Sequence, residues 1–253
     1  MQPTSGLKML EISAPMMGRV ETIFPTLLWD QHTAVLIDAG YPGQLPLLRA
    51  AVEQAGLPFE KLSHLILTHQ DLDHIGSLPT ILEAAPQKIE VLANAVEKPY
   101  IEGEQQLLKL TPAAIAQAEA SLPPDVPVEW RNAFLSMLQH PPKAPVDKTV
   151  TDGEQLPIGG GLTILDTPGH TPGHISLYHA ASKTLIAGDA LMVVDGQLQG
   201  PHPDYTLDMD TAIHSLQTLT RYDIETVICY HGGLFNDQAN RRLAQLASEL
   251  PHL

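Results

Sequence analysis

The chain has 253 residues, of which 43% are hydrophobic, and this length suffices for one large domain over residues 1–253 with a well-buried core. The formal net charge of −15 and the lack of any Lys or Arg run argue against nucleic-acid binding, which depends on clustered cations that neutralise phosphates. No apolar run is long enough to span a bilayer, and no basic head precedes an apolar core at the N-terminus. The single cysteine, Cys229, excludes an intrachain disulfide, so we expect a cytoplasmic protein with no membrane partner.

The first part of the chain predicts short strands mixed with helices. Strands are expected at 10–13, 22–28, 34–38, 62–68 and 89–92. One helix is expected at 47–55, where apolar residues recur at helical spacing and Gly56 marks the end, and another is expected at 78–84.

A helical insert is predicted between about 94 and 146. Helices are expected at 102–110 and at 111–121, the second with Thr111 as its N-cap and Pro112 in its first turn. A third short helix carries an apolar stripe that includes Trp130 and Phe134. We favour an insert that packs on the surface of the domain, because apolar helix stripes usually face a core. The alternative is a lid over a substrate pocket.

The last part of the chain repeats the mixture of strands and helices. Strands are expected at 162–166, 175–179, 184–188 and 226–230. A helix with one apolar stripe is predicted at 209–219 with Asp208 as its cap, and a last helix is predicted at 237–250.

Side chains that can bind metal ions follow four of these predicted strands. They are His69, Asp71, Asp73 and His74 after the 62–68 strand, His170 after the 162–166 strand, Asp189 after the 184–188 strand and His231 after the 226–230 strand. Strand ends converge on a crevice, and isolated carboxylates are costly to bury. A shared metal site therefore explains these residues better than four unrelated polar turns.

This set of residues resembles the signature of the metallo-β-lactamase superfamily, which reads H-x-H-x-D-H, then a G-H-T turn, a bridging Asp and a final His. The resemblance runs in order over nearly the whole chain, from the 36–40 strand to His231. It implies an α+β fold, a four-layer αββα sandwich of two mixed sheets with helices outside. It assigns one metal ion to His69, Asp71 and His170, a second to Asp73, His74 and His231, and the bridge between them to Asp189.

The resemblance also implies supporting roles for two residues. Asp38, at the end of an early strand, would orient the metal-binding loop by hydrogen bonds. His174, four residues after His170, would pack behind the site and not bind a metal ion, because the first His of this turn is the superfamily's ligand.

Asp71 stands where most of the superfamily has a second His in the motif. The three carboxylates then give the ligands a formal charge of −3, so two divalent cations and one hydroxide make a neutral site. The extra carboxylate also makes the ligand set harder. We therefore expect two divalent ions per chain, with Zn²⁺ preferred and Fe or Mn as alternatives.

We interpret the chain as a dinuclear metal-dependent hydrolase in which a hydroxide held between the cations attacks a small ester, lactone or thioester. Asp73 and Asp189 are the expected catalytic residues. Within the superfamily the chain looks most like acyl-homoserine lactonases and glyoxalase II-type thioesterases, with Met192 where the lactonases carry Tyr. Phosphoester hydrolysis, non-haem di-iron redox chemistry and a metal-binding scaffold without catalysis are the alternatives.

A small molecule is the expected partner, and the sequence leaves a homodimer open. Five residues are expected to contact that molecule: Trp130, Phe134, Met192, His202 and Tyr205.

Overall fold

The computed structural model describes residues 5–16 and 19–249. Its centre is a pair of six-stranded mixed sheets. The first has the order β1 (Gly6–Met9), β4 (Thr26–Trp29), β5 (Ala34–Ile37), β6 (His64–Ile66), β7 (Glu90–Asn94) and β8 (Lys148–Val150). Its first three strands are antiparallel neighbours, and β5 to β8 run parallel, so the loops after β5, β6 and β7 leave the same edge.

The second sheet is built in the same mixed way. Its order is β16 (Gly233–Phe235), β15 (Thr226–Cys229), β12 (Thr184–Gly188), β11 (Ile175–His179), β10 (Leu162–Asp166) and β9 (Gln155–Leu156). Only β12 and β15 are parallel neighbours, and the loops that follow them carry Asp189 and His231.

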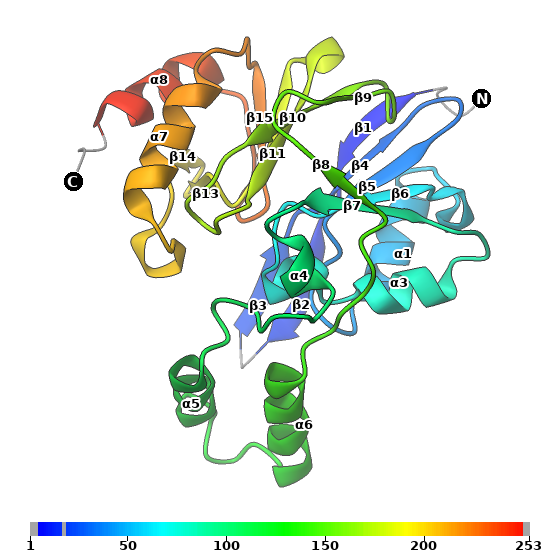
Figure 1. Cartoon of the computed structure of the whole chain (residues 1–253), viewed down its shortest axis with the longest axis vertical. Coiled ribbons are helices and arrows are strands. Elements are labelled where there is room, and N and C mark those ends of the chain that lie inside the picture. The colour runs from blue at the N-terminus through cyan, green and yellow to red at the C-terminus, as the bar shows by residue number, and fades with distance from the viewer. Residues whose placement is uncertain (1–4, 17–18, 250–253) are drawn as a thin grey trace.

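Three apolar cores separate four layers, which confirms the predicted αββα sandwich (Figure 1). Leu36 faces a core shared with helices α1 (Leu45–Gln54) and α3 (Leu78–Ala84), whereas its neighbours Val35 and Ile37 face the space between the sheets. Leu165 likewise faces α7 (Met209–Leu219) and α8 (Ala239–Glu249). The alternation of side chains along each strand therefore supplies both faces of each sheet with apolar contacts.

Further elements connect and border this sandwich. They are α2 (Leu72–Ile75), α4 (Lys98–Ile101), α5 (Pro112–Ala120), α6 (Val128–Gln139), the hairpins β2 (Ile12–Met16) with β3 (Arg19–Ile23) and β13 (Met192–Val194) with β14 (Gln197–Gln199), and the 3₁₀ turns at Phe59–Lys61, Ala180–Ser182 and Pro203–Tyr205. Across the described residues, none of the helices has the length and apolarity needed to cross a membrane.

Three predicted elements differ from the structure. The strand expected at 10–13 overlaps only the start of β2, because residues 10 and 11 lie between β1 and β2. The strand expected at 22–28 is divided into β3 and β4, because Pro25 has no N–H to donate to a ladder. The helix expected at 102–110 is wrong. The chain forms α4 earlier, with Pro99 in its first turn, and Gly103 ends the helical run with a φ of 72°.

The insert extends away from the sandwich (Figure 1). Thr111 Oγ1 accepts a hydrogen bond from Ala114 N, so the predicted N-cap of α5 is confirmed. None of the α5 residues is buried, and Leu138 is the buried residue of α6. The two helices contact each other, and the apolar stripe of α6 faces a cavity instead of the core.

Candidate metal centre

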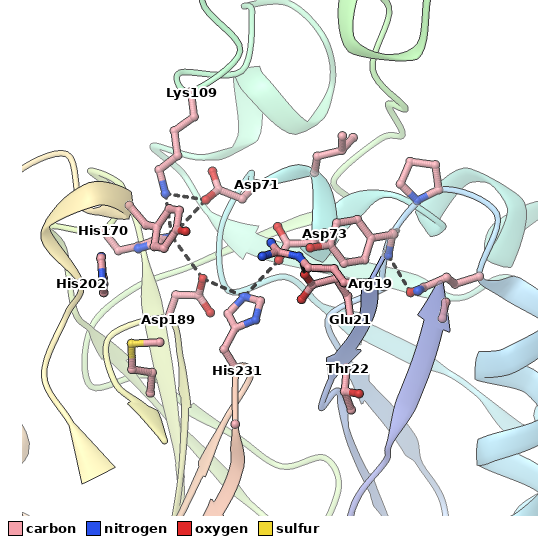
Figure 2. A pocket seen from close by; sticks show the side chains of 18 of the residues that line it. Arg19, Glu21, Thr22, Asp71, Asp73, Lys109, His170, Asp189, His202 and His231 are labelled. Carbon is pink, nitrogen blue, oxygen red and sulfur yellow. Dashed lines mark hydrogen bonds and ion pairs between the residues drawn. The ribbon is translucent and has the colours of Figure 1, made fainter. Parts of the chain in front are cut away.

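The structure brings the seven predicted ligand residues to one end of the sandwich, where they meet from both sheets. Figure 2 shows Asp71, Asp73, His170, Asp189 and His231 of this set. His69 and Asp71 follow β6, Asp73 and His74 lie in α2, and His170 lies in the β10–β11 turn. Asp189 follows β12, and His231 follows β15. Each side chain therefore stands at the carboxyl end of a strand or just beyond it, as the sequence predicts.

Ligand-type atoms gather in two groups. His69, His170 and Asp189 each offer one atom within 4.8 Å of the others, and Asp73, His74 and His231 do the same. His231 Nε2 lies 3.1 Å from Asp73 Oδ2, and His170 Nε2 lies 3.3 Å from Asp189 Oδ2. Ligands at the vertices of a tetrahedral zinc site, with bonds of about 2.0–2.1 Å, lie about 3.3 Å apart. The spacing within both groups is thus close to that around a metal ion.

Asp189 connects the two groups. Its Oδ1 lies 3.4 Å from His74 Nε2, and its Oδ2 lies 3.5 Å from His231 Nε2, in addition to the contact with His170. The backbone at Gly188 allows Asp189 to lie between the two groups. Its φ is 54°, and a Cβ there would lie 2.7 Å from His174 Nε2.

Three buried atoms of these groups have no hydrogen-bond partner: His69 Nε2, His74 Nε2 and Asp189 Oδ1. A buried polar atom without a partner costs free energy, and each of these three offers a lone pair toward the same small space. The four imidazoles and three carboxylates are the nitrogen and oxygen ligands that divalent metal ions take. The residues therefore fit a metal centre.

Hydrogen bonds behind the ligands set which nitrogen of each imidazole faces the centre. His74 Nδ1 lies 3.0 Å from Asp38 Oδ2, and His69 Nδ1 lies 3.0 Å from Thr68 Oγ1. Thr68 N and Oγ1 both donate to Asp38, whose φ of 66° is unusual for a residue with a side chain. Asp38 thus occupies the orienting position that the resemblance implies, and both Nε2 atoms are left free to bind a cation.

His174 lies behind the centre with both ring nitrogens already bonded. Its Nδ1 lies 2.8 Å from Thr167 Oγ1, and its Nε2 accepts a hydrogen bond from Asp189 N. Burial and the neighbouring His170 lower the pKa of His174 to about 3, so it stays neutral. It holds the Asp189 backbone and has no nitrogen left for a metal ion.

The carboxylates make the potential at the centre strongly negative. Burial by itself lowers the pKa of His231, but Asp189 and Asp73 outweigh it and raise that pKa to about 10. Burial also lowers the pKa of His74, and Asp38 and Asp189 outweigh it, so that pKa is well above its usual value. Burial raises the pKa of Asp189, and the imidazoles of His231 and His74 bring it well below the usual range. Such a field favours positive charge.

Asp71 lies beside the first group, and a lysine from the insert contacts it. Asp71 Oδ2 is 3.2 Å from His69 Nε2 and 3.0 Å from His170 Nε2. Lys109 Nζ lies 2.5 Å from the same oxygen. Sequence reasoning missed Lys109, because nothing in the neighbouring residues distinguishes it from a surface lysine.

A second network that the sequence did not reveal joins the two ligand-bearing loops. Glu97, fully buried, accepts hydrogen bonds from Gln70 N and Gln70 Nε2 through one oxygen and from Gly173 N through the other. Gln70 Oε1 in turn accepts a hydrogen bond from Leu108 N in the insert. Burial raises the pKa of Glu97, and these donors oppose that shift. One carboxylate of the insert thus holds the loops that carry His69 and His170.

A cavity of about 980 Å³ opens over the centre. Asp71, Asp73, His170, Asp189 and His231 line its floor. All five predicted substrate residues line its walls: Trp130, Phe134, Met192, His202 and Tyr205. The rings of Trp130 and Phe134 stack with centroids 6.1 Å apart, and Trp130 is 53% exposed. The apolar stripe of α6 is therefore directed at whatever enters the cavity.

Comparisons with known proteins agree with this geometry. The family model of the metallo-beta-lactamase superfamily matches residues 19–231. The probable metallo-hydrolase YflN of Bacillus subtilis is 32% identical over 215 residues, which cover 80% of this chain and 76% of that protein. The hydroxyacylglutathione hydrolase GloC of Haemophilus influenzae is 28% identical, with coverage of 82% and 84%. These relatives share most of their length with this chain.

Solved structures show the same fold. A metallo-beta-lactamase family protein from Thermus thermophilus superimposes with a TM-score of 0.67 and 24% identity, and the match covers 96% of this chain and 79% of that one. The family match, the αββα layers and the clustered histidines and aspartates point to one conclusion. The chain belongs to the metallo-β-lactamase superfamily and is a metal-dependent hydrolase of that family.

Proposed function

We propose that the chain hydrolyses small, uncharged carboxylic esters, lactones or thioesters with the help of two divalent metal ions. The observation that carries the proposal is the set of three buried, unpartnered ligand atoms, His69 Nε2, His74 Nε2 and Asp189 Oδ1. Asp189 lines a cavity that has an apolar wall. The proposal concerns the number of ions and the class of substrate, which go beyond membership of the superfamily.

Seven residues would hold the ions, in the two groups that Asp189 joins: His69, Asp71, His170, Asp73, His74, His231 and Asp189. Bound divalent ions supply a water of lowered pKa and polarise the oxygen of the carbonyl that is attacked. Zn²⁺ suits the mixed nitrogen and oxygen donors, and Fe or Mn suits the added carboxylate of Asp71.

The carboxylates of Asp73 and Asp189 are the catalytic residues we propose. Both line the cavity floor, so each can take a proton from water or pass it to the leaving group. The Tyr230 hydroxyl donates to the Asp73 backbone oxygen at 2.5 Å, and its ring packs against His74 at a tilt of 33°, with centroids 3.8 Å apart. Tyr230 therefore keeps Asp73 and His74 in one orientation.

The apolar wall fits the acyl part of a substrate. Trp130, Phe134 and Met137 of α6 line the cavity, and so do Leu191 and Met192 at the start of β13. Apolar contact stabilises a bound acyl chain by excluding water from it. The cavity volume of about 980 Å³ suits a small molecule.

Charges around the cavity favour a neutral substrate over a phosphoester. Arg19 pairs with Glu21, and Lys109 pairs with Asp71, so both basic side chains of the described lining already have acidic partners. Phosphoester recognition usually uses Arg or Lys side chains that are free to pair with the phosphate. The hydroxyacylglutathione hydrolases among the relatives support a thioester as one member of the class.

The proposal is tested by metal analysis followed by a substrate panel. Protein purified without added metal is analysed for its elements, stripped with a chelator, and reloaded with Zn²⁺, Mn²⁺ or Fe²⁺. Each form is assayed against carboxylic esters, lactones, thioesters and phosphodiesters. We expect metal-dependent turnover of at least one carbonyl substrate.

Asp189→Asn removes the carboxylate that joins the two groups and should lower kcat/KM by about 100-fold or more. Asp125→Asn, at an exposed turn between α5 and α6, is the matched control and should leave activity unchanged. Turnover of phosphodiesters alone, or equal turnover by the stripped and reloaded forms, would contradict the proposal.

A further inference from the structure

The Lys109 ammonium group contacts Asp71 and His170, as Figure 2 shows. Together with His69, these two residues form the first cation position. Lys109 Nζ lies 2.5 Å from Asp71 Oδ2 and 2.7 Å from His170 Nε2. An ammonium group can only donate hydrogen bonds, so the contact with Lys109 requires His170 Nε2 to accept. In the tautomer that makes this contact, Nε2 carries no proton for Asp71 Oδ2, which lies 3.0 Å away. An imidazole nitrogen has one lone pair, and this is the lone pair that would bind a metal ion. Lys109 and a cation therefore require the same electrons of His170.

The position of Lys109 is fixed by the buried network next to it. Leu108 N donates to Gln70 Oε1 at 2.8 Å, and Gln70 Nε2 donates to Glu97 at 2.9 Å. The backbone beside Lys109 is thus tied to the residue between His69 and Asp71. The Lys109 side chain is 24% exposed, so it reaches the centre from the wall of the cavity and is only partly solvated.

The formal charges balance with one cation and the ammonium group. The three carboxylates of Asp71, Asp73 and Asp189 contribute −3, and the imidazoles are counted as neutral. One divalent ion contributes +2 and Lys109 contributes +1, so the sum is zero without a second divalent ion. A second divalent ion would bring the sum to +2 before any hydroxide binds, with Lys109 in contact with one of its ligands. Repulsion between like charges at such short range lowers affinity.

The second position differs in this respect. Asp73 makes its ion pairs with His74 and His231, both of them ligand residues of the same group. Asp189 can bind a cation there through Oδ1, which has no hydrogen-bond partner. The two positions therefore differ in their contacts. The positively charged Lys109 contacts two residues of the first position, whereas Asp73 of the second position pairs with ligand residues of its own group.

We propose that Lys109 competes with the metal ion at the His69–Asp71–His170 position, so that the chain fills the Asp73–His74–His231 position first. We expect the second ion to bind about tenfold or more weakly than the first. This inference rests on the proposed function only in that both require these residues to bind metal ions.

The test is a titration of metal-free protein with Co²⁺. Binding is measured by calorimetry and by the visible absorption of the bound ion. Wild type is compared with Lys109→Met, which has a similar length and no charge, and with Lys109→Arg, which keeps the charge. Lys143→Met is the matched control, because Lys143 is an exposed lysine of the same insert. Lys109→Gln serves in place of the methionine variant if that variant fails to fold.

Wild type, Lys109→Arg and Lys143→Met should show two unequal binding steps. Lys109→Met should tighten the weaker step by about tenfold or more and leave the stronger step within about twofold. Two equal steps in wild type, or an unchanged weaker step in both uncharged variants, would overturn the inference. If both ions bind as expected but no carbonyl substrate is hydrolysed, the proposed function fails and the inference stands.

Discussion

Glu97 is a buried carboxylate that stabilises both ligand-bearing loops, and Glu97→Gln tests how much. The glutamine side chain has the same shape but one oxygen. That oxygen can accept either from Gly173 N, now at 2.7 Å, or from Gln70 N and Gln70 Nε2, now at 3.0 and 2.9 Å. At least one buried N–H then faces an amide NH₂ group and has no acceptor.

The expected loss follows from the hydrogen bonds involved. A bond to a charged acceptor contributes about 1.5–3 kcal/mol, and an unsatisfied buried donor costs about 1–3 kcal/mol. Removing the charge offsets part of this loss, because burial disfavours the ionised carboxyl and raises its pKa. We therefore expect a net loss of about 2 kcal/mol, or a decrease of Tm by about 4–8 °C for a chain of this size.

Thermal unfolding is measured by circular dichroism in excess chelator, so that metal affinity does not contribute to Tm. Glu104→Gln, an exposed glutamate of the same insert, is the control and should leave Tm unchanged. A Tm of Glu97→Gln within about 1 °C of wild type would show that the network does not stabilise the loops.

Three further predictions concern acid stability, metal removal and substrate choice. Hydrogen bonds from the His32, Thr33 and Gly160 amides outweigh burial and lower the pKa of Asp30 to about 2, below its ordinary 3.8. The stabilisation is therefore present above pH 3.8 and is lost as pH falls toward 2. Asp30→Asn should lower the free energy of unfolding by about 1–2 kcal/mol at pH 7, after a discount for solvent screening. The difference between the urea midpoints of wild type and variant should shrink below about pH 4. A constant difference down to about pH 3 would refute this prediction. Chelation should lower Tm by several degrees, and Zn²⁺ should restore it, because the cation offsets the repulsion among Asp71, Asp73 and Asp189; equal melting curves would speak against a metal centre. Trp130→Ala should raise KM about fivefold for long acyl chains and leave acetyl substrates unaffected, since Trp130 lines the cavity and is 53% exposed. Equal changes for both substrates would assign Trp130 a structural role.

Local pattern was enough to pick out the candidate ligand residues, and the resemblance to the superfamily supplied the main layers. The ligand residues directly follow apolar runs, and a strand that runs toward a shared edge must deliver its next residues to that edge. His69, Asp71, Asp73 and His74 lie on one short turn, so their proximity hardly depends on the rest of the fold. The caps Thr111 and Asp208 were also predictable, because a cap bonds to a residue three positions away.

The tertiary structure decided which distant residues complete the centre. Lys109 reaches Asp71 across 38 residues of chain, and Glu97 joins Gln70 to Gly173 across 27 and 76. Neither contact has a local signature, because a lysine in a turn and a glutamate before a short helix are ordinary surface residues in the sequence. The direction of the α6 stripe is of the same kind, since periodicity shows that one face is apolar but not what that face meets. Sequence therefore determined the candidate ligands by local geometry, whereas long-range packing determined their charged neighbours and the wall of the cavity.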